Sequence, residues 1–135
     1  MEIRVTSPQQ ARRTNRFDGV ASRPVAPLAR AGGAAGLAAA AAIYFWLGGA
    51  WWLALALLLA PDLAFVGFAV STRFGVAAYN SAHRPLVPAT LTVLALVAGS
   101  RIVVLLMLIW LGHIAMDRAA GYGLKQAPTA ASARA

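Results

Sequence analysis

The sequence contains no cysteine, and only four of its 135 residues are acidic. The absence of cysteine excludes disulfides and thiolate metal sites. Charged residues make up 12% of the chain and hydrophobic residues 60%, whereas soluble domains average about 25% charged and about 45–50% apolar residues. Together with a mean hydropathy of +0.67, this composition predicts a single-domain integral membrane protein.

The shortage of acidic residues leaves a net charge of +8. A basic excess can indicate nucleic-acid binding, but no interleaving of aromatic and basic residues typical of an RNA- or DNA-binding module is present. Basic residues that flank apolar spans are instead the usual orientation signal of membrane proteins, and they attract anionic headgroups. The arginines before the first apolar run are Arg4, Arg12, Arg13, Arg16, Arg23 and Arg30. The predicted partners are therefore membrane lipids with anionic headgroups on the cytoplasmic side, and no nucleic acid.

The apolar runs predict an all-α polytopic membrane protein with about four transmembrane helices, over residues 28–47, 50–70, 85–98 and 102–119. The third run is short for a crossing of about 20 residues, so it either tilts little or extends backward through a short helix at 79–83. Pro61 lacks a backbone donor and disfavours helix in the preceding residue, which predicts a break in the second span near Ala60. Gly32 and Gly36 either allow close helix packing in lipid or reflect the alanine-rich composition.

The domain organisation follows from these runs. Residues 1–27 are predicted to be a disordered basic cytoplasmic tail, residues 28–125 a four-helix transmembrane domain, and residues 126–135 a second disordered tail. Four crossings place both termini on one side, where the basic residues gather with Arg101 as the exception. The positive-inside rule then predicts a multi-pass protein of the bacterial cytoplasmic (inner) membrane with both termini in the cytoplasm.

Four ionisable side chains lie in or beside the apolar spans: Asp62, His83, His113 and Asp117. An aspartate at the centre of a membrane helix costs at least about 2.5–3.5 kcal/mol, so mutual satisfaction is expected. At about 1.5 Å per residue, Asp62 and His113 lie roughly 18 Å into their spans and Asp117 roughly 24 Å. His113 and Asp117, four residues apart, share a helix face. All four groups are therefore predicted to meet in the cytoplasmic half of the membrane.

Two carboxylates and two imidazoles are a ligand set for zinc, manganese or ferrous iron. A metal with an open coordination position lowers the pKa of a bound water, which would suit hydrolysis. Two other readings stay open on the residues alone. The four side chains could tie helices together in a non-enzymatic protein. They could also mark an ion route in a small proton-coupled carrier, which would need a homo-oligomer to enclose a path.

Three further residues are predicted to lie beside the four ligand candidates. Asn80 is either a partner of a ligand or a link between helices, and Trp110, three residues before His113, either walls a pocket or packs. Arg118 either neutralises Asp117 or binds a phosphate headgroup, unless it reaches for the interface.

Three sequence blocks resemble a known family. The stretches "APDLAFVGF", "GVAAYNSAHRPLVP" and "WLGHIAMDRAAGYGLK" are similar, in order and spacing, to the signature blocks of the domain-of-unknown-function family numbered 4260. That family contains small bacterial integral membrane proteins, and the resemblance covers about residues 32–125. Phe68 stands where the family often has tyrosine, and Arg84 where it often has serine or threonine. The resemblance implies the membrane fold and no particular activity.

A weaker likeness concerns the chemistry. The order Pro-Asp, His, then His-x-x-x-Asp is similar to that of the LexA-regulated membrane-bound metal-dependent hydrolases, which implies metal-binding roles for Asp62, His83, His113 and Asp117. The T-H-S triplet of those proteins is replaced here by Ala82–Arg84. The expected function is a metal-dependent hydrolase with one zinc or manganese ion, acting at the cytoplasmic leaflet on a lipid or lipid-linked phosphoester.

Overall fold

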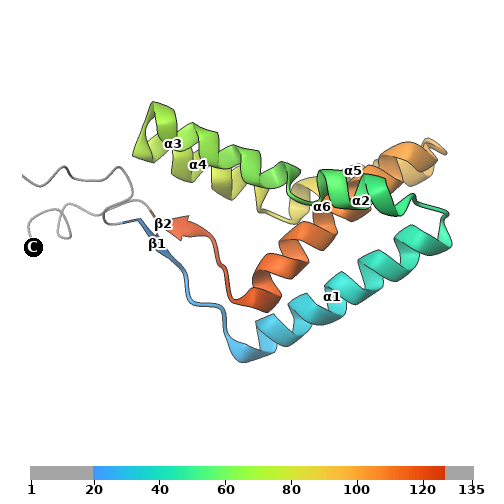
Figure 1. The fold of residues 1–135 in the computed structure, drawn as a ribbon, viewed down its shortest axis with the longest axis horizontal. Coiled ribbons are helices and arrows are strands. Elements are labelled where there is room, and N and C mark those ends of the chain that lie inside the picture. The colour runs from blue at the N-terminus through green and yellow to red at the C-terminus, as the bar shows by residue number, and fades with distance from the viewer. Residues whose placement is uncertain (1–19, 127–135) are drawn as a thin grey trace, which may run out of the picture.

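The computed structural model describes residues 20–126, so most of the two predicted tails, residues 1–19 and 127–135, lies outside the described residues. Helices dominate the fold (Figure 1): α1 Pro27–Trp46, α2 Trp51–Leu58, η1 Ala60–Val66, α3 Gly67–Val70, α4 Thr72–Ala82, α5 Leu86–Val97 and α6 Arg101–Ala120. Two short strands, β1 Ala21–Ser22 and β2 Lys125–Gln126, complete it. They were not predicted, and β1 falls in the segment that the sequence assigned to the N-terminal tail.

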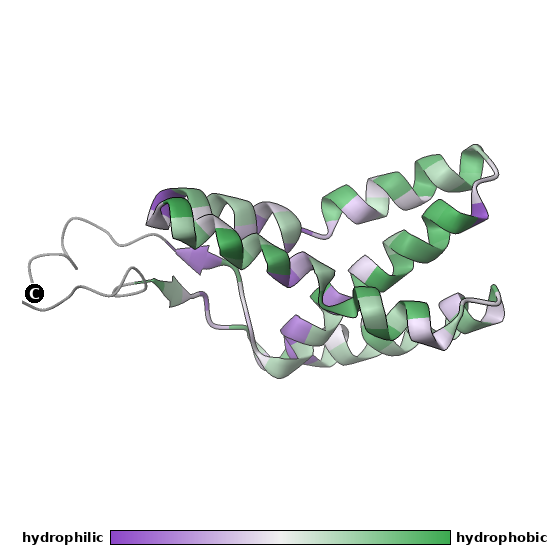
Figure 2. Ribbon diagram, turned by 45° about the horizontal axis from the view of Figure 1, so that its top comes forward, coloured by the Kyte–Doolittle hydropathy of each residue, from purple (hydrophilic) through white to green (hydrophobic). Residues whose placement is uncertain are grey.

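Three helical stretches are long and apolar enough to cross a membrane, namely Pro27–Trp46, Trp51–Val70 and Arg101–Ala120. Their outward faces carry apolar side chains, as in Val70 at 73% exposure and Ile102 at 57%. Figure 2 shows that hydrophobic residues predominate along the helices. Such a surface suits lipid rather than water as the solvent. The predicted all-α polytopic membrane fold is confirmed.

The third predicted span forms one short helix, α5, and a separate helix, α4, precedes it. α5 has 12 residues, about 18 Å at 1.5 Å per residue, against a hydrocarbon core of about 30 Å. α4 precedes it and ends at its C-cap residue His83, and Pro85 then begins α5 as its N-cap. The backward extension considered for this span is thus a separate helix, because proline cannot continue the hydrogen bonding of α4.

The second span breaks where the sequence predicts. α2 ends at Leu58, and the seven residues Ala60–Val66 form a 3-10 helix with Pro61 in its first turn. The chain reverses at Ser71, whose hydroxyl accepts a hydrogen bond from the Phe74 amide and caps α4. η1 and α3 pack against α4 as a helical hairpin that projects from the other helices (Figure 1). This arrangement brings the Pro61 break opposite the end of α4.

α1 and α6 lie side by side and antiparallel, with the ends of the described chain together (Figure 1). The Arg30 side chain donates a hydrogen bond to the Ala119 carbonyl at one end (3.2 Å), and Arg101 donates to the Leu47 carbonyl at the other. β1 pairs with β2 beyond the first of these ends. The first and last described elements therefore meet at the same end of the α1–α6 pair.

Close contact between α1 and α6 depends on Gly33. A Cβ atom at this position would lie 2.7 Å from the Ala119 nitrogen and 2.8 Å from the Ala115 carbonyl oxygen. The predicted pair behaves differently, because a Cβ at Gly36 meets only Ala115 Cβ at 3.5 Å and one at Gly32 meets nothing within 4 Å. Small residues do bring the helices together in this fold, but the contact lies one residue after Gly32.

We predict that Gly33→Ala lowers the thermal stability of the detergent-purified protein. The added methyl group would clash with the backbone of α6, which cannot move aside as a flexible side chain can. Overpacking of this kind costs about 1–3 kcal/mol. Thermal unfolding followed by circular dichroism measures the loss, and Gly32→Ala is the matched control. Equal melting temperatures for the two variants would contradict this packing.

Candidate metal centre

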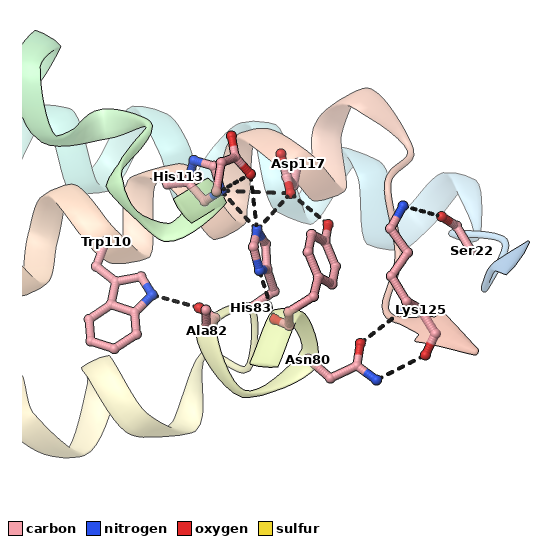
Figure 3. A network of polar contacts seen from close by, with 10 residues as sticks. Ser22, Asn80, Ala82, His83, Trp110, His113, Asp117 and Lys125 are labelled. Carbon is pink, nitrogen blue, oxygen red and sulfur yellow. Dashed lines mark hydrogen bonds and ion pairs between the residues drawn. The ribbon is translucent and has the colours of Figure 1, made fainter. Parts of the chain in front are cut away.

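Breaks in the helices deliver two of the four candidate ligands. Asp62 follows Pro61 in the first turn of η1, and His83 is the residue on which α4 ends. His113 and Asp117 come from one face of α6, four residues apart. One ligand atom from each of the four residues can be chosen so that all lie within 4.8 Å of one another. Figure 3 shows His83, His113 and Asp117 pointing toward a common point.

We call Asp62, His83, His113 and Asp117 the His/Asp cluster. Its His–Asp distances can be compared with the lengths of hydrogen bonds and with the spacing of ligands around one metal ion. His83 Nε2 lies 3.5 Å from Asp62 Oδ1 and 3.4 Å from Asp117 Oδ2. His113 Nε2 lies 3.5 and 3.8 Å from the same two oxygens. All four exceed the usual 2.7–3.2 Å of N–H···O hydrogen bonds. A tetrahedron with metal–ligand bonds of about 2.0–2.1 Å has edges of about 3.3–3.4 Å. Three of the four distances are close to this length, and the fourth, 3.8 Å, is longer.

His83 presents an unprotonated nitrogen to the cluster. Its Nδ1 lies 2.8 Å from the Tyr79 carbonyl oxygen, and because a carbonyl only accepts, Nδ1 carries the proton and donates it. In the neutral ring Nε2 then carries no proton and has a free lone pair. This nitrogen lies 3.0 Å from Nε2 of His113. A histidine whose other nitrogen donates to a backbone carbonyl is the usual form of a metal ligand.

His113 is the most deeply buried member, with a side chain 0% exposed. Its Nε2 faces the cluster, and within residues 20–126 its Nδ1 is the one buried side-chain polar atom that lacks a hydrogen-bond partner. Leaving such an atom unpaired costs about 1–3 kcal/mol. The nitrogen of His113 that has polar neighbours is Nε2, which faces Asp62, His83 and Asp117.

The carboxylates lie toward the more open side of the cluster. The side chain of Asp62 is 38% exposed and that of Asp117 18%, while His83 is 4% and His113 0% exposed. Two carboxylates and two neutral imidazoles would balance the charge of one divalent cation, and buried charges require such compensation. The donor set fits zinc, manganese or ferrous iron.

Tyr79 was not predicted to belong to the site. Its hydroxyl donates to Asp117 Oδ2 (3.2 Å), and its ring stacks on His83 with centroids 3.7 Å apart and an interplanar angle of 14°. The spacing offered a signal, because Tyr79 and His83 lie four residues apart on one helix face. Tyr79 thus orients two of the four candidate ligands at once, as outer partners of metal ligands do.

Comparison with known proteins supports the resemblance seen in the sequence. The profile of the family described as "Domain of unknown function (DUF4260)" matches residues 27–132. The chain belongs to this family. No curated protein and no solved structure matches the chain. The family description states no activity, so the chemistry of this DUF4260 chain is argued from its own residues.

Two of the predicted neighbours bind backbone away from the ligand atoms. In this DUF4260 chain the Asn80 amide donates to the Lys125 carbonyl (2.9 Å) and accepts from the Lys125 amide (2.8 Å), which ties β2 to α4. The Trp110 indole donates to the Ala82 carbonyl at 2.6 Å. That carbonyl lies at the end of α4, so the indole satisfies a backbone group freed by the helix break. Both residues support the segment that carries His83.

Arg118, the third predicted neighbour, lies beside the cluster on a cavity wall. The cavity has a volume of about 220 Å³ and reaches the cluster at His83 and Asp117. Tyr79 and Ile114 also line it, and Arg23 and Tyr122 come from the segments next to β1 and β2. The cluster of this DUF4260 chain can therefore be approached from the end where the two strands pair.

Proposed function

We propose that the chain is a membrane-embedded metal-dependent hydrolase whose His/Asp cluster holds one divalent ion, zinc or manganese. The observation that carries this proposal is the set of four His–Asp distances between 3.4 and 3.8 Å. They are long for hydrogen bonds and suit ligands that share an ion.

The residues divide by exposure into those that hold the ion and one that can serve the reaction. A divalent ion in this position would supply Lewis acidity toward a substrate oxygen and toward water. His83, His113 and Asp117 are the better-buried ligands, and three protein ligands are usual in catalytic zinc sites. Asp62, at 38% exposure, is the carboxylate placed to accept a proton from an attacking water.

A purely structural cluster is the competing function, and one distance favours it. His83 Nε2 and His113 Nε2 are 3.0 Å apart, so His113 can donate a hydrogen bond to His83. That bond joins α6 to the end of α4 without a metal. In this arrangement, however, both carboxylates lie beyond good hydrogen-bonding distance of the imidazoles. Among the described residues, the only side-chain hydrogen bond to Asp117 is then the one from the Tyr79 hydroxyl.

The proposed setting is the cytoplasmic leaflet of a bacterial inner membrane. Three helices able to cross a membrane support a membrane protein. Arg23, Arg30, Arg118 and Lys125 lie at the end where β1 and β2 pair, while Arg101 lies at the opposite end. The positive-inside rule assigns the strand-bearing end to the cytoplasm, which is also the end nearer the His/Asp cluster.

Hydrolysis by the full chain in detergent, loaded with zinc or manganese, tests this function. We expect chromogenic carboxylic and phosphoric esters to be hydrolysed at a rate that chelation removes. His113→Ala should reduce this rate more than about 100-fold, because loss of an outer partner alone costs about 10–100-fold. Arg73→Gln, at an exposed arginine outside the site, should leave the rate unchanged. A bound ion without hydrolysis of any of these esters would assign the cluster to structure.

A further inference from the structure

A second cavity adjoins the one beside the His/Asp cluster. The second cavity, of about 540 Å³, lies between α1 and α6. The two cavities have three wall residues in common, Ala29, Ile114 and Arg118. We call the first the polar chamber and the second the apolar groove. Because they share these wall residues, the polar chamber and the apolar groove are adjacent, and their linings differ in chemistry.

The polar chamber is suited to an anion. Two of its wall residues, Arg23 and Arg118, are basic, and one, Asp117, is acidic. Within residues 20–126 every ion pair joins an aspartate to a histidine, so neither guanidinium group is neutralised by a carboxylate. Guanidinium groups present paired donors that match the oxygens of a phosphate. The chamber therefore has two arginines that pair with no carboxylate of residues 20–126, next to the candidate metal ligands.

The apolar groove is suited to hydrocarbon. Small residues of α1, Gly32, Gly36 and Ala40, form one wall, and Leu108 and Leu111 of α6 form another. Its volume falls within the range of about 300–1,000 Å³ that is common for ligand sites. A groove with these walls on a membrane-spanning helix pair would fill with an acyl chain more readily than with water.

We infer that the polar chamber and the adjacent apolar groove together bind a lipid that carries a terminal phosphate. Its phosphate lies against Arg23 and Arg118, and one acyl chain lies in the groove between α1 and α6. As a substrate assignment this rests on the proposed function. In the reaction, the oxygen of a water molecule bonds to phosphorus while the bond from phosphorus to the ester oxygen breaks. Asp62 takes the proton from water, and the departing alcohol oxygen receives a proton in return.

Lipid binding can be measured separately from metal binding. Full-length protein in phosphatidylcholine nanodiscs is titrated with fluorescent phosphatidic acid, with soluble glycerol 3-phosphate as the competitor that lacks acyl chains. We expect phosphatidic acid to be retained and glycerol 3-phosphate to compete poorly. Arg118→Gln should weaken retention about tenfold or more, because a charge-assisted hydrogen bond contributes that much. Gly32→Leu should also weaken retention, since its Cβ meets no atom within 4 Å and the added side chain occupies the groove.

The controls separate this inference from the proposed function. Arg73→Gln removes an exposed arginine outside both cavities and should bind as wild type. His113→Ala should lose bound metal yet retain phosphatidic acid, while Arg118→Gln should keep its metal. Equal binding of phosphatidic acid and fluorescent phosphatidylcholine would overturn the lipid inference and leave the metal centre standing. Equal loss in the Arg73 and Arg118 variants, efficient competition by glycerol 3-phosphate, or normal binding by Gly32→Leu would overturn it too.

Discussion

Replacing His113 by alanine is expected to abolish stoichiometric metal binding and, with it, the part of the thermal stability that depends on metal. His113 contributes a fully buried ligand nitrogen that lies 3.0 Å from His83 Nε2 and 3.5 Å from Asp62 Oδ1. A metal that binds only the folded state adds about 2.7 kcal/mol of stability when its free concentration is 100 times Kd. Wild-type protein should therefore melt several degrees lower after chelation, and the variant should not respond to chelation.

The comparison needs a variant that loses packing without losing a ligand. Leu108→Ala serves this purpose, because Leu108 is buried on the same helix at 7% exposure. Truncating a buried leucine costs about 2–5 kcal/mol, so this variant should melt lower than wild type and still respond to chelation. A chelation response that survives in His113→Ala would mean that the stabilising metal binds elsewhere.

Tyr79→Phe is expected to weaken metal binding about 10–100-fold, the usual cost of losing an outer partner of a metal ligand. The substitution keeps the ring that stacks on His83 and removes only the hydroxyl that donates to Asp117. Competition against a zinc chelator of known affinity measures the change. Metal content at saturating zinc should remain near that of wild type, because all four candidate ligands are still present.

Tyr44→Phe is the matched control for this effect. The Tyr44 hydroxyl also donates a single hydrogen bond, to the Ala50 carbonyl at 2.8 Å, but it belongs to the core cluster with Val104 and Leu108 rather than to the site. This variant should lose some stability and keep its metal affinity. If Tyr44→Phe and Tyr79→Phe weakened zinc binding equally, the effect would be one of general destabilisation.

Much of the fold is readable from the sequence, because in a membrane the backbone must satisfy its own hydrogen bonds and apolar runs become helices. The runs at 28–47 and 102–119 correspond to α1 and α6 within a residue. Pro61 marked the break of the second span. Gly121 follows α6, adopts φ +94° and ends the helix, as a glycine after the last turn commonly does.

Other features depend on contacts that no local pattern encodes. The α1–α6 contact at Gly33, rather than at Gly32 and Gly36, depends on how α1 is rotated about its axis against α6. The bond between Asn80 and the backbone of Lys125 joins residues 45 apart in sequence. Spacing alone therefore placed Asn80 near the ligands but could not show that it binds β2.

The candidate site was the most predictable part of the molecule, for an energetic reason. Aspartate and histidine are costly in a membrane unless they meet compensating groups, so Asp62, His83, His113 and Asp117 were expected to converge. The structure brings them within 4.8 Å of one another. The role of Tyr79 was missed, although its four-residue spacing from His83 offered a signal, and its ring stack on His83 and hydrogen bond to Asp117 reveal it.

The central claim is that the His/Asp cluster binds one divalent metal ion, with His83, His113 and Asp117 as its best-buried ligands. Elemental analysis of the detergent-purified wild-type protein, after zinc loading and removal of unbound ion, tests it most directly. We predict about one zinc per chain, with X-ray absorption showing only nitrogen and oxygen ligands at about 2.0–2.1 Å. Wild-type protein that stays folded yet retains no stoichiometric zinc, manganese or iron would contradict the account.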